Sequence, residues 1–521
     1  MVHPATPSHV EHVDVLIVGA GISGIGAAYY LQKEHPGRSY AILEARGATG
    51  GTWDLFRYPG IRSDSDLHTF GYEFKPWRDE DAIASADKIL AYLRETVAEN
   101  GIDAKIRFHH KVLGAAWSSD DARWTVDVER FGGTDDSEEL VQFSANWIFC
   151  AGGYYRYDQG YTPEFPGRER FRGQVVHPQH WPEDLDYTDK KVVVIGSGAT
   201  AVTLIPAMAG TAAHVTMLQR SPTYVLPVPS KDTFANVAQK VLGSKRGYAL
   251  ARRKNIVKQR AVYQLSQKYP GAARRLIRHL NAKELPAGYP VDEHFKPTYN
   301  PWDQRLCAVP DADLFKAISS GGASVVTDRI ATFTETGIQL ESGKHLDADI
   351  IVTATGLNVQ LLGGMSLTVD GTPVRAGDTV AYKSMILSGV PNFAFAFGYT
   401  NSSWTLKVGL LCEHFCRLLS HMDAQGHDIA CPEIGGHGIE TRPMLDFAAG
   451  YVQRALDRIP KQGSGEPWRV SMNYYYDVEQ LRDGDVDNAE LHFSSSRIPA
   501  VSAVVAADRT AAAVGRSTAR R

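Results

Sequence analysis

Two glycine-rich loops hold the residues whose types and spacing could do chemistry in this chain. The first loop, Gly19 to Gly24, follows an apolar run that ends at Val18, and the second, Gly196 to Ala201, follows a similar run at 191–195. Glycines at this spacing let a pyrophosphate approach backbone N–H groups where a helix begins. For either loop alone, a purely structural glycine turn is the alternative. Two such loops indicate two bound dinucleotides and therefore redox chemistry.

Polar residues after the following strands complete the candidate nucleotide sites. Glu44, at the end of the second strand, can accept hydrogen bonds from ribose hydroxyls. The equivalent place in the second unit holds Arg220 and Ser221, and an arginine there favours NADPH over NADH because it can bind a 2′-phosphate. A solvated surface arginine is the alternative. The loop candidates are Gly19, Gly21, Ser23 and Gly24 in the first unit, and Gly196, Ser197, Gly198, Ala199, Thr200 and Ala201 in the second.

The elements that must position these loops form two strand–helix–strand units. Strands are expected at 13–18 and 40–44 around a helix at 22–33, and at 191–195 and 214–218 around a helix at about 199–209. The sequence therefore predicts an α/β fold with two Rossmann-like dinucleotide-binding domains and a mainly helical insertion in the second. The expected ranges are 1–158 and 391–498 for the first domain, 159–220 and 316–390 for the second, 221–315 for the insertion, and 499–521 for a disordered tail.

Composition excludes several classes of protein. A net charge of −4 over 521 residues gives no reason to expect a nucleic-acid partner or an anionic membrane surface. No apolar run is long enough to cross a membrane, and the N-terminus lacks the pattern of a signal peptide, so we expect a cytoplasmic protein. The five cysteines form no CxxC pair, which argues against a dithiol reductase, and neither they nor the histidines show metal-ligand spacing. The oligomeric state stays open.

A twelve-residue stretch between the loops is the most discriminating pattern. Residues 171–182 fit FxGxxxHxxxWP, and the fixed positions are Phe171, Gly173, His177, Trp181 and Pro182. With this stretch the chain resembles the type I Baeyer–Villiger monooxygenases, whereas flavin-containing N- and S-monooxygenases lack the Trp-Pro pair. Residues 50–64, with a Gly-Gly-x-Trp start and a Tyr-Pro-Gly-x-x-x-Asp end, resemble a second pattern of that family. Segments 301–307 and 399–407 are similar to its ethionamide-activating group.

The resemblance implies FAD in the first domain, NADPH in the second, and O2 as a substrate. A C4a-peroxyflavin would attack a ketone to give an ester or lactone, and would also oxidise sulfides and thioamides. The implied partner is thus a small ketone or sulfide. The alternative is a flavin-containing N- or S-monooxygenase without ketone activity, and a non-catalytic NADPH-binding regulator is a further rival.

The same resemblance suggests roles for individual residues. Arg305 would be the cation that stabilises developing negative charge, with Asp64 as the carboxylate that tunes it; a structural salt bridge and a turn aspartate are the alternatives. His177 could act as a base, but we prefer an interdomain strut. Trp404 is a candidate for the wall of the active site, or a core residue. The flavin contacts implied are Thr52, Trp53, Asp54, Leu55 and Asp64, with Arg62 and Ser63 nearer the nicotinamide and Val112 beside the adenine.

Overall fold

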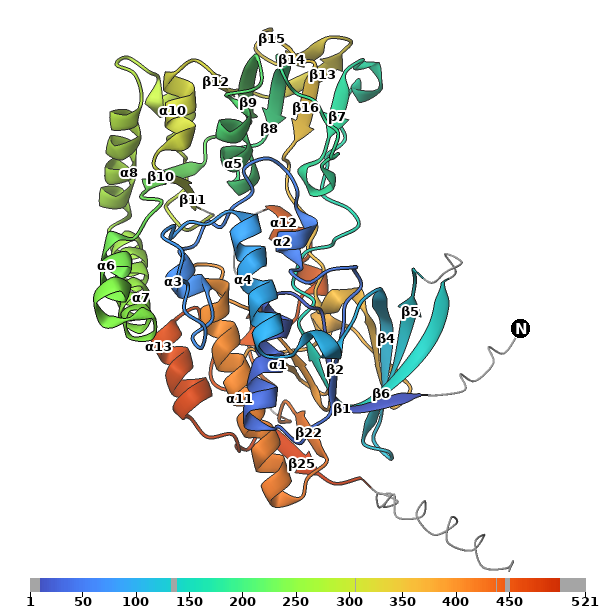
Figure 1. The fold of residues 1–521 in the computed structure, drawn as a ribbon. Helices are drawn as coiled ribbons and strands as arrows, with labels where there is room; N and C mark the ends of the chain where they lie inside the picture. The colour runs from blue at the N-terminus through green and yellow to red at the C-terminus, as the bar shows by residue number, and fades with distance from the viewer. Residues whose placement is uncertain (1–9, 133–137, 305, 437, 446–449, 497–521) are drawn as a thin grey trace, which may run out of the picture.

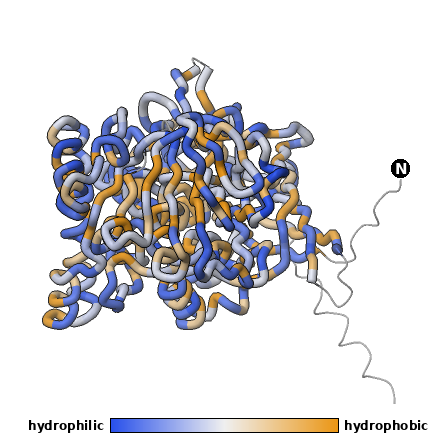
Figure 2. Tube along the Cα trace, turned by 90° about the horizontal axis from the view of Figure 1, so that it is seen from above, coloured by the Kyte–Doolittle hydropathy of each residue, from blue (hydrophilic) through white to orange (hydrophobic). Residues whose placement is uncertain are grey.

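The protein has two α/β lobes with a helical hairpin along one side (Figure 1). The structure, a computed structural model, describes residues 10–132, 138–304, 306–436, 438–445 and 450–496. The predicted tail at 499–521 lies outside these ranges. No described helix is long and apolar enough to cross a membrane. Seen from above, hydrophobic segments of the chain run through the middle of the molecule among hydrophilic ones (Figure 2).

The first lobe is built on an eleven-stranded sheet. Its main path runs β18-β17-β4-β5-β6-β1-β2-β3, and β21 joins it at β6. Strand β1 is buried on both faces, because helices cover one side and further strands the other. The strands are β1 (Glu11–Val18), β2 (Tyr40–Leu43), β3 (Ile106–Arg107), β4 (His110–Ser118), β5 (Arg123–Arg130), β6 (Glu139–Cys150), β17 (Ser366–Val369), β18 (Thr372–Val374), β19 (Ala381–Tyr382), β20 (Ile386–Leu387) and β21 (Phe393–Phe395).

The helices of the first lobe come from both ends of the chain. Helix α1 packs against α11, so the C-terminal part of the chain completes the domain that the N-terminal part begins. The helices are α1 (Ile22–Glu34), α2 (Thr52–Leu55), α3 (Leu67–Phe70), α4 (Ala86–Glu99), α11 (Trp404–Gln425), α12 (Gly450–Gln453) and α13 (Tyr474–Asp477). Two small antiparallel pairs of strands join β22 (Ile429–Pro432) to β25 (Leu491–Ser494) and β23 (Thr441–Pro443) to β24 (Lys461–Gly463).

The chain returns to the first sheet earlier than the sequence predicts. Strand β17 pairs in parallel with β4, and β19 to β21 also join this sheet. The range 316–390 assigned to the second domain is therefore too long at its C-terminal end. These strands have two to four residues each, and so short a pattern carries no information about which sheet it joins.

The second lobe is a five-stranded parallel sheet in the order β12-β9-β8-β16-β7. With the first lobe it confirms the predicted α/β class with two Rossmann-like domains. Its strands are β7 (Gln174–Val176), β8 (Lys191–Ile195), β9 (His214–Gln219), β12 (Ala323–Thr327) and β16 (Ile350–Thr353), with helices α5 (Ala199–Met208) and α10 (Asp313–Ser319). A three-stranded antiparallel sheet adds β13 (Ile330–Thr334), β14 (Gly337–Leu340) and β15 (His345–Asp347).

Helices dominate the segment between β9 and α10. They are α6 (Thr233–Leu242), α7 (Ser244–Lys268), α8 (Pro270–Glu284) and α9 (Val291–His294). A parallel pair of strands, β10 (Tyr224–Val228) and β11 (Leu306–Pro310), closes the segment at its base. Helix α7 packs against α3 of the first lobe, so this segment contacts both lobes.

Candidate active site

One large cavity connects the two lobes. Its volume is about 1590 Å³, which exceeds the space that a single small ligand needs. The wall includes residues of the first glycine loop, of segment 58–66, of helix α5 and of the helical insertion. The candidates on this wall are Gly19, Gly21, Ser23, Glu44, Thr52, Trp53, Arg62, Ser63, Asp64, Val112, Ala199 and Thr200.

The first glycine loop fits a bound pyrophosphate. Gly19 has a φ of +101°, and a β-carbon there would lie 2.8 Å from the carbonyl oxygen of Ala151. A β-carbon on Gly24 would lie 1.9 Å from the carbonyl oxygen of Gly19, so this glycine brings α1 against the loop. The N-cap of α1 is Gly21, and no side chain caps the helix. Its first N–H groups are therefore available to an anion.

Glu44 braces this loop from the neighbouring strand. Its carboxylate oxygens accept hydrogen bonds from the backbone N–H groups of Ala20, at 2.7 Å, and of Arg46, at 2.9 Å. Burial raises the pKa of Glu44, and the two N–H donors oppose that rise. The side chain lies on the cavity wall, so the donor and acceptor set at this end suits a dinucleotide such as FAD.

The segment that follows Gly51 divides into two parts. Thr52 and Trp53 lie on the cavity wall, but Asp54 and Leu55 are buried and do not contribute to it. The Asp54 carboxylate accepts hydrogen bonds from Arg46 at 2.6 Å and from Arg57 at 2.8 Å. Asp54 therefore stabilises the turn behind the wall, and the structure does not place it where the sequence predicted a flavin contact.

Arg62, Ser63 and Asp64 form a continuous part of the wall. Arg62 donates two hydrogen bonds to Asp313 of α10, at 2.5 and 3.3 Å, and so joins the first lobe to the second. The Ser63 hydroxyl donates to the carbonyl oxygen of Ser65 at 2.7 Å and fixes the turn. Asp64 is the exposed member of the three, which leaves its carboxylate accessible from the cavity.

The predicted cation, Arg305, lies outside the described residues. Its chain neighbours Gln304 and Leu306 line the same cavity as Asp64. The pairing of Arg305 with Asp64 therefore stays a prediction.

The second glycine loop lies at the carboxyl end of β8. The N–H of Gly196 donates to the carbonyl oxygen of Leu218 at 2.8 Å, which holds the loop beside β9. Gly198 is the N-cap of α5 and no side chain caps this helix, so it also offers N–H groups to an anion. Ala199 and Thr200 lie on the cavity wall, whereas Ala201 is fully buried between helix and sheet.

Arg220 and Ser221 lie near this loop. Both are exposed and directly follow β9, which pairs with β8. The hydroxyl of Ser197 is 2.7 Å from that of Thr223, so the loop and the segment after β9 are in contact. The arrangement gives a second dinucleotide a helix N-terminus for its pyrophosphate and an arginine for a 2′-phosphate, as NADPH requires.

The twelve-residue motif lies away from the cavity. In the described part of the chain, none of its five fixed residues lines the wall. The Nε2 of His177 donates to the carbonyl oxygen of Gly356 at 3.2 Å, and its Nδ1 accepts from the N–H of Gln179 at 3.2 Å. Burial lowers the pKa of His177, which favours this neutral state. These contacts support a strut rather than a base.

The rest of the motif packs on the linkers and the second sheet. The Gln179 amide donates to the carbonyl oxygens of Arg156 and Tyr157, at 2.7 and 2.8 Å. A β-carbon on Gly173 would lie 2.2 Å from the carbonyl oxygen of Asp349, so this position has no room for a side chain. Phe171 is in the core of the second lobe, and Trp181 packs at the edge of another part of that core.

Trp404 is part of the cavity wall. Its indole N–H donates to the Ser23 hydroxyl at 2.9 Å, and its ring stacks on Tyr154 with centroids 5.2 Å apart. The first residue of α11 thus contacts the start of α1, which places α11 beside the first glycine loop.

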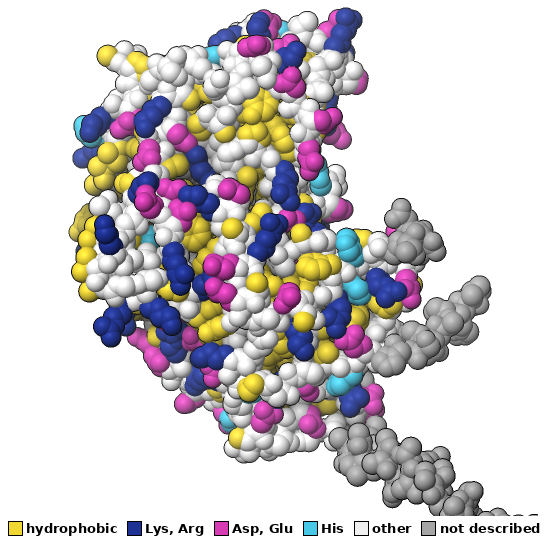
Figure 3. All heavy atoms as spheres, viewed as in Figure 1, with side chains coloured by type: hydrophobic (Ala, Val, Ile, Leu, Met, Phe, Trp, Pro, Cys, Tyr) yellow, Lys and Arg dark blue, Asp and Glu magenta, His cyan; other side chains and the backbone are white. Residues whose placement is uncertain are grey.

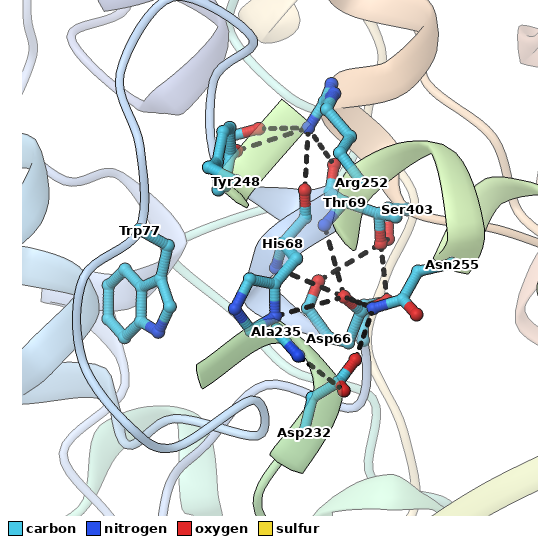
Figure 4. Close-up of polar contacts among 12 residues, drawn as sticks. Asp66, His68, Thr69, Trp77, Asp232, Ala235, Tyr248, Arg252, Asn255 and Ser403 are labelled. Carbon is cyan, nitrogen blue, oxygen red and sulfur yellow. Dashed lines mark hydrogen bonds and ion pairs between the residues drawn. The ribbon is translucent and has the colours of Figure 1, made fainter. Parts of the chain in front are cut away.

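A polar network around Asp66 was missed in the sequence (Figure 4). Asp66 caps α3, and its carboxylate also accepts from Asn255, at 2.9 Å, and Gln259, at 2.6 Å, of α7. Arg252, which is buried, donates to the carbonyl oxygens of His68, Thr69 and Gly71. The network fixes segment 62–71 against the insertion. Its only local signal is an aspartate at an N-cap; the partners lie more than 180 residues later.

Within the described ranges, no group of three His, Cys, Asp or Glu side chains could hold a metal ion.

Comparison with known proteins identifies the family. Residues 76–362, more than half of the chain, match a family model described as flavin-binding monooxygenase-like. The chain belongs to this family. Residues 17–79 also match the NAD(P)-binding Rossmann-like domain, in agreement with the first glycine loop. The prediction of a flavin monooxygenase is thereby confirmed.

Individual relatives narrow the group. The FAD-containing monooxygenase EthA of Mycobacterium tuberculosis strain H37Rv is 53% identical over 490 residues, which cover 94% of this chain and 99% of EthA. EthA of Mycolicibacterium smegmatis is 53% identical over 488 residues, covering 94% of this chain and 98% of the relative. This flavin-dependent monooxygenase is therefore of the EthA group.

Solved structures share the whole fold. A steroid monooxygenase bound to NADP superposes with a TM-score of 0.71 at 23% identity, over 93% of this chain and 100% of that one. An open cyclohexanone monooxygenase superposes with a TM-score of 0.72 at 19% identity, with the same coverage. At these identities the likeness shows that the two-lobed architecture is shared.

Proposed function

We propose that this flavin monooxygenase is an FAD- and NADPH-dependent Baeyer–Villiger enzyme. It converts ketones to esters or lactones with O2, and it oxidises sulfides and thioamides at sulfur. The observation that carries the proposal is the single cavity onto which the first glycine loop, the start of α5, Asp64 and both neighbours of Arg305 open. The relatives in the EthA group and the ketone-monooxygenase folds support it.

The two nucleotide sites have distinct residues. FAD is held by the first loop with Glu44, and Thr52, Trp53 and the backbone around Val112 lie along it. NADPH is held by the second loop, with Arg220 on its 2′-phosphate. Bound FAD, once reduced by NADPH, would activate O2, and O2 would supply the oxygen atom that is transferred. The protein supplies positions, charge and a wall that excludes water.

Arg305 and Asp64 have electrostatic roles in the proposal. Addition of oxygen to a carbonyl carbon places negative charge on the carbonyl oxygen. A guanidinium stays protonated at any working pH and can stabilise that charge with oriented N–H donors. Asp64 holds the guanidinium at the wall and balances its charge between turnovers.

The alternative is an N- or S-monooxygenase without ketone activity. It would use the same two cofactors and the same cavity. The Trp181–Pro182 pair favours the ketone reaction through the sequence pattern alone. Trp181 packs within the second lobe and does not line the cavity, so it has no direct contact with the reaction site. The two classes differ in whether a ketone is converted to an ester, so the products formed distinguish them.

Product analysis tests the proposal. Purified FAD-loaded protein with NADPH and air is given an aliphatic methyl ketone and, separately, an aryl methyl sulfide. We expect an ester from the ketone, and we expect Arg305→Ala to lose ester formation by a factor of about 100 or more while it retains FAD. Arg329→Ala, an exposed arginine of the second lobe, is the matched control. Sulfoxide without any ester would assign the protein to the alternative class.

A further inference from the structure

The helical insertion differs in charge from the rest of the protein. Residues 233–284 contain thirteen Lys and Arg residues and a single acidic residue, Glu284, although the whole chain has a net charge of −4. Most of these cations are exposed. Among the described residues, no carboxylate lies within salt-bridge distance of Lys240, Lys245 or Arg253. The insertion thus presents a strongly positive surface on a nearly neutral protein.

The same helices carry most of the exposed large apolar side chains. Ten of the fourteen such residues in the described part of the chain lie between 233 and 284. They are Phe234, Val237, Val241, Leu242, Leu250, Val257, Val262, Leu265, Tyr269 and Leu276. Val241 is 73% exposed and Leu276 is 58% exposed. We call these residues and the surrounding cations the α6–α8 surface.

Helical spacing places these apolar residues on outward faces. Phe234, Val237 and Val241 follow one another at intervals of three and four on α6, and Leu250, Val257 and Leu265 lie within one stripe of α7. The opposite face of α7, with Tyr248, is buried against the first lobe. The insertion therefore has one anchored side and one apolar, cationic side without a partner among the described residues.

Charged and apolar groups alternate closely on this surface. Lys254 lies 4.6 Å from the ring centre of Phe234, across the α6–α7 hairpin. Along the left edge of Figure 3, over these helices, hydrophobic side chains lie beside Lys and Arg. A helix pair with aliphatic residues and long cations on one side is suited to the boundary between headgroups and acyl chains.

We propose that the α6–α8 surface docks on an anionic lipid surface. Acidic headgroups complement the cations, and the valines and leucines enter the acyl boundary. A second copy docked face to face would oppose two strongly positive surfaces. A nucleic acid would complement the charge but would leave the aliphatic side chains in water. The lipid surface is the occupant that accounts for both properties, and this inference does not depend on which substrate the enzyme oxidises.

The cavity opens within this surface. Phe234, Val262 and Leu276 are exposed members of the α6–α8 surface and also line the cavity. A molecule dissolved in the bilayer can therefore pass from the lipid to the cavity along apolar side chains. Docking gives the enzyme access to apolar substrates that are scarce in water.

Vesicle sedimentation tests the docking with the full-length, FAD-loaded protein. We expect binding to vesicles of phosphatidylglycerol and phosphatidylcholine, weaker binding at high salt, and little binding to phosphatidylcholine alone. Two variants address the two components of the surface: Val237→Glu with Val241→Glu, and Lys240→Glu with Lys245→Glu and Arg253→Glu. Each should lower the partition coefficient by roughly tenfold or more.

A matched control separates the surface from general effects. Leu140→Glu makes the same kind of change at a residue of β6 that is 68% exposed and lies in the first lobe; it should bind as the unmodified protein does. Retained FAD absorbance and NADPH oxidation show that the variants are folded. Equal binding of all variants, or no preference for acidic lipid, overturns the proposal. A variant that changes the oligomeric state in lipid-free buffer and leaves vesicle binding intact also overturns it.

Discussion

Arg62, in the wall of the cavity, and Asp313 of α10 form an ion pair with two hydrogen bonds, at 2.5 and 3.3 Å. Their side chains are 14% and 28% exposed. The charge of Arg62 is thus balanced by the protein itself. The pair links the segment that carries Asp64 to the second lobe.

Asp313→Asn should weaken this link and lower kcat/KM for NADPH. Loss of the carboxylate partner of a partly buried arginine costs about 1–2 kcal/mol. This corresponds to roughly a five- to thirtyfold loss in kcat/KM. The effect should appear mainly in KM, because Asp313 lies outside the proposed oxygen-transfer site. Steady-state kinetics with NADPH as the varied substrate measures it.

The exposed pair Arg278–Asp292 provides the control for this experiment. Arg278 Nε also lies 2.5 Å from the Asp292 carboxylate, but both side chains are about half exposed. Ion pairs between exposed side chains contribute little to stability. Asp292→Asn should leave the kinetics unchanged. An equal loss in both variants would show that the interlobe link has no special role.

Arg252 is a second point where one side chain connects the insertion to the first lobe. Its buried guanidinium donates to three carbonyl oxygens at the end of α3. Arg252→Met would leave the carbonyl oxygens of His68 and Gly71 without this donor, and we expect a loss of about 3 kcal/mol in unfolding free energy. Chemical denaturation measures it. Arg253→Met, at the exposed neighbouring position, should change stability by less than about 0.5 kcal/mol.

The contrast between these contacts and the glycine loops shows what the sequence can predict. A loop such as Gly19 to Gly24 performs its function through its own backbone, so local spacing reveals it. Strand β8 begins at Lys191 and ends at Ile195, as predicted. The Asp66 network joins residues of α3 and α7 that are far apart in the chain, and hydrophobic periodicity contains no information about such pairs.

Arg220 should control the choice of nicotinamide cofactor. It is exposed after β9, beside the second loop. Arg220→Ala removes charge-assisted hydrogen bonds to a 2′-phosphate, worth about 1.5–3 kcal/mol. The ratio of kcat/KM for NADPH to that for NADH should fall by at least tenfold. Arg172→Ala, an exposed arginine on another edge of the lobe, should leave the ratio unchanged; an unaltered ratio in the Arg220 variant would contradict the assignment.

The misplaced boundary near residue 390 has a related cause. The segment 366–387 contains four strands of two to four residues, each too short for a distinct periodicity. Their pairing with β4 and β21 is decided by tertiary packing around residues such as Leu367 and Tyr382. Sequence order alone suggested that they continue the second lobe. The dinucleotide units were predicted because each is complete within about 30 consecutive residues.

His177 should make the connection between the lobes sensitive to acid. Burial lowers its pKa below the usual 6.5, so the unfolded chain binds a proton more readily than the folded protein does. The contribution of His177 to the free energy of unfolding is therefore at its maximum above pH 6.5. It declines as the pH falls toward and through the lower pKa that His177 has in the folded protein. Protonation would also remove the acceptor at Nδ1 that binds Gln179.

Melting temperatures from pH 8 to 5.5 should therefore fall less steeply in His177→Asn than in the unmodified protein. His180→Asn, at the exposed neighbouring histidine, should keep the original slope. Parallel slopes for all three proteins would mean that the neutral His177 contact with Gly356 does not contribute to stability.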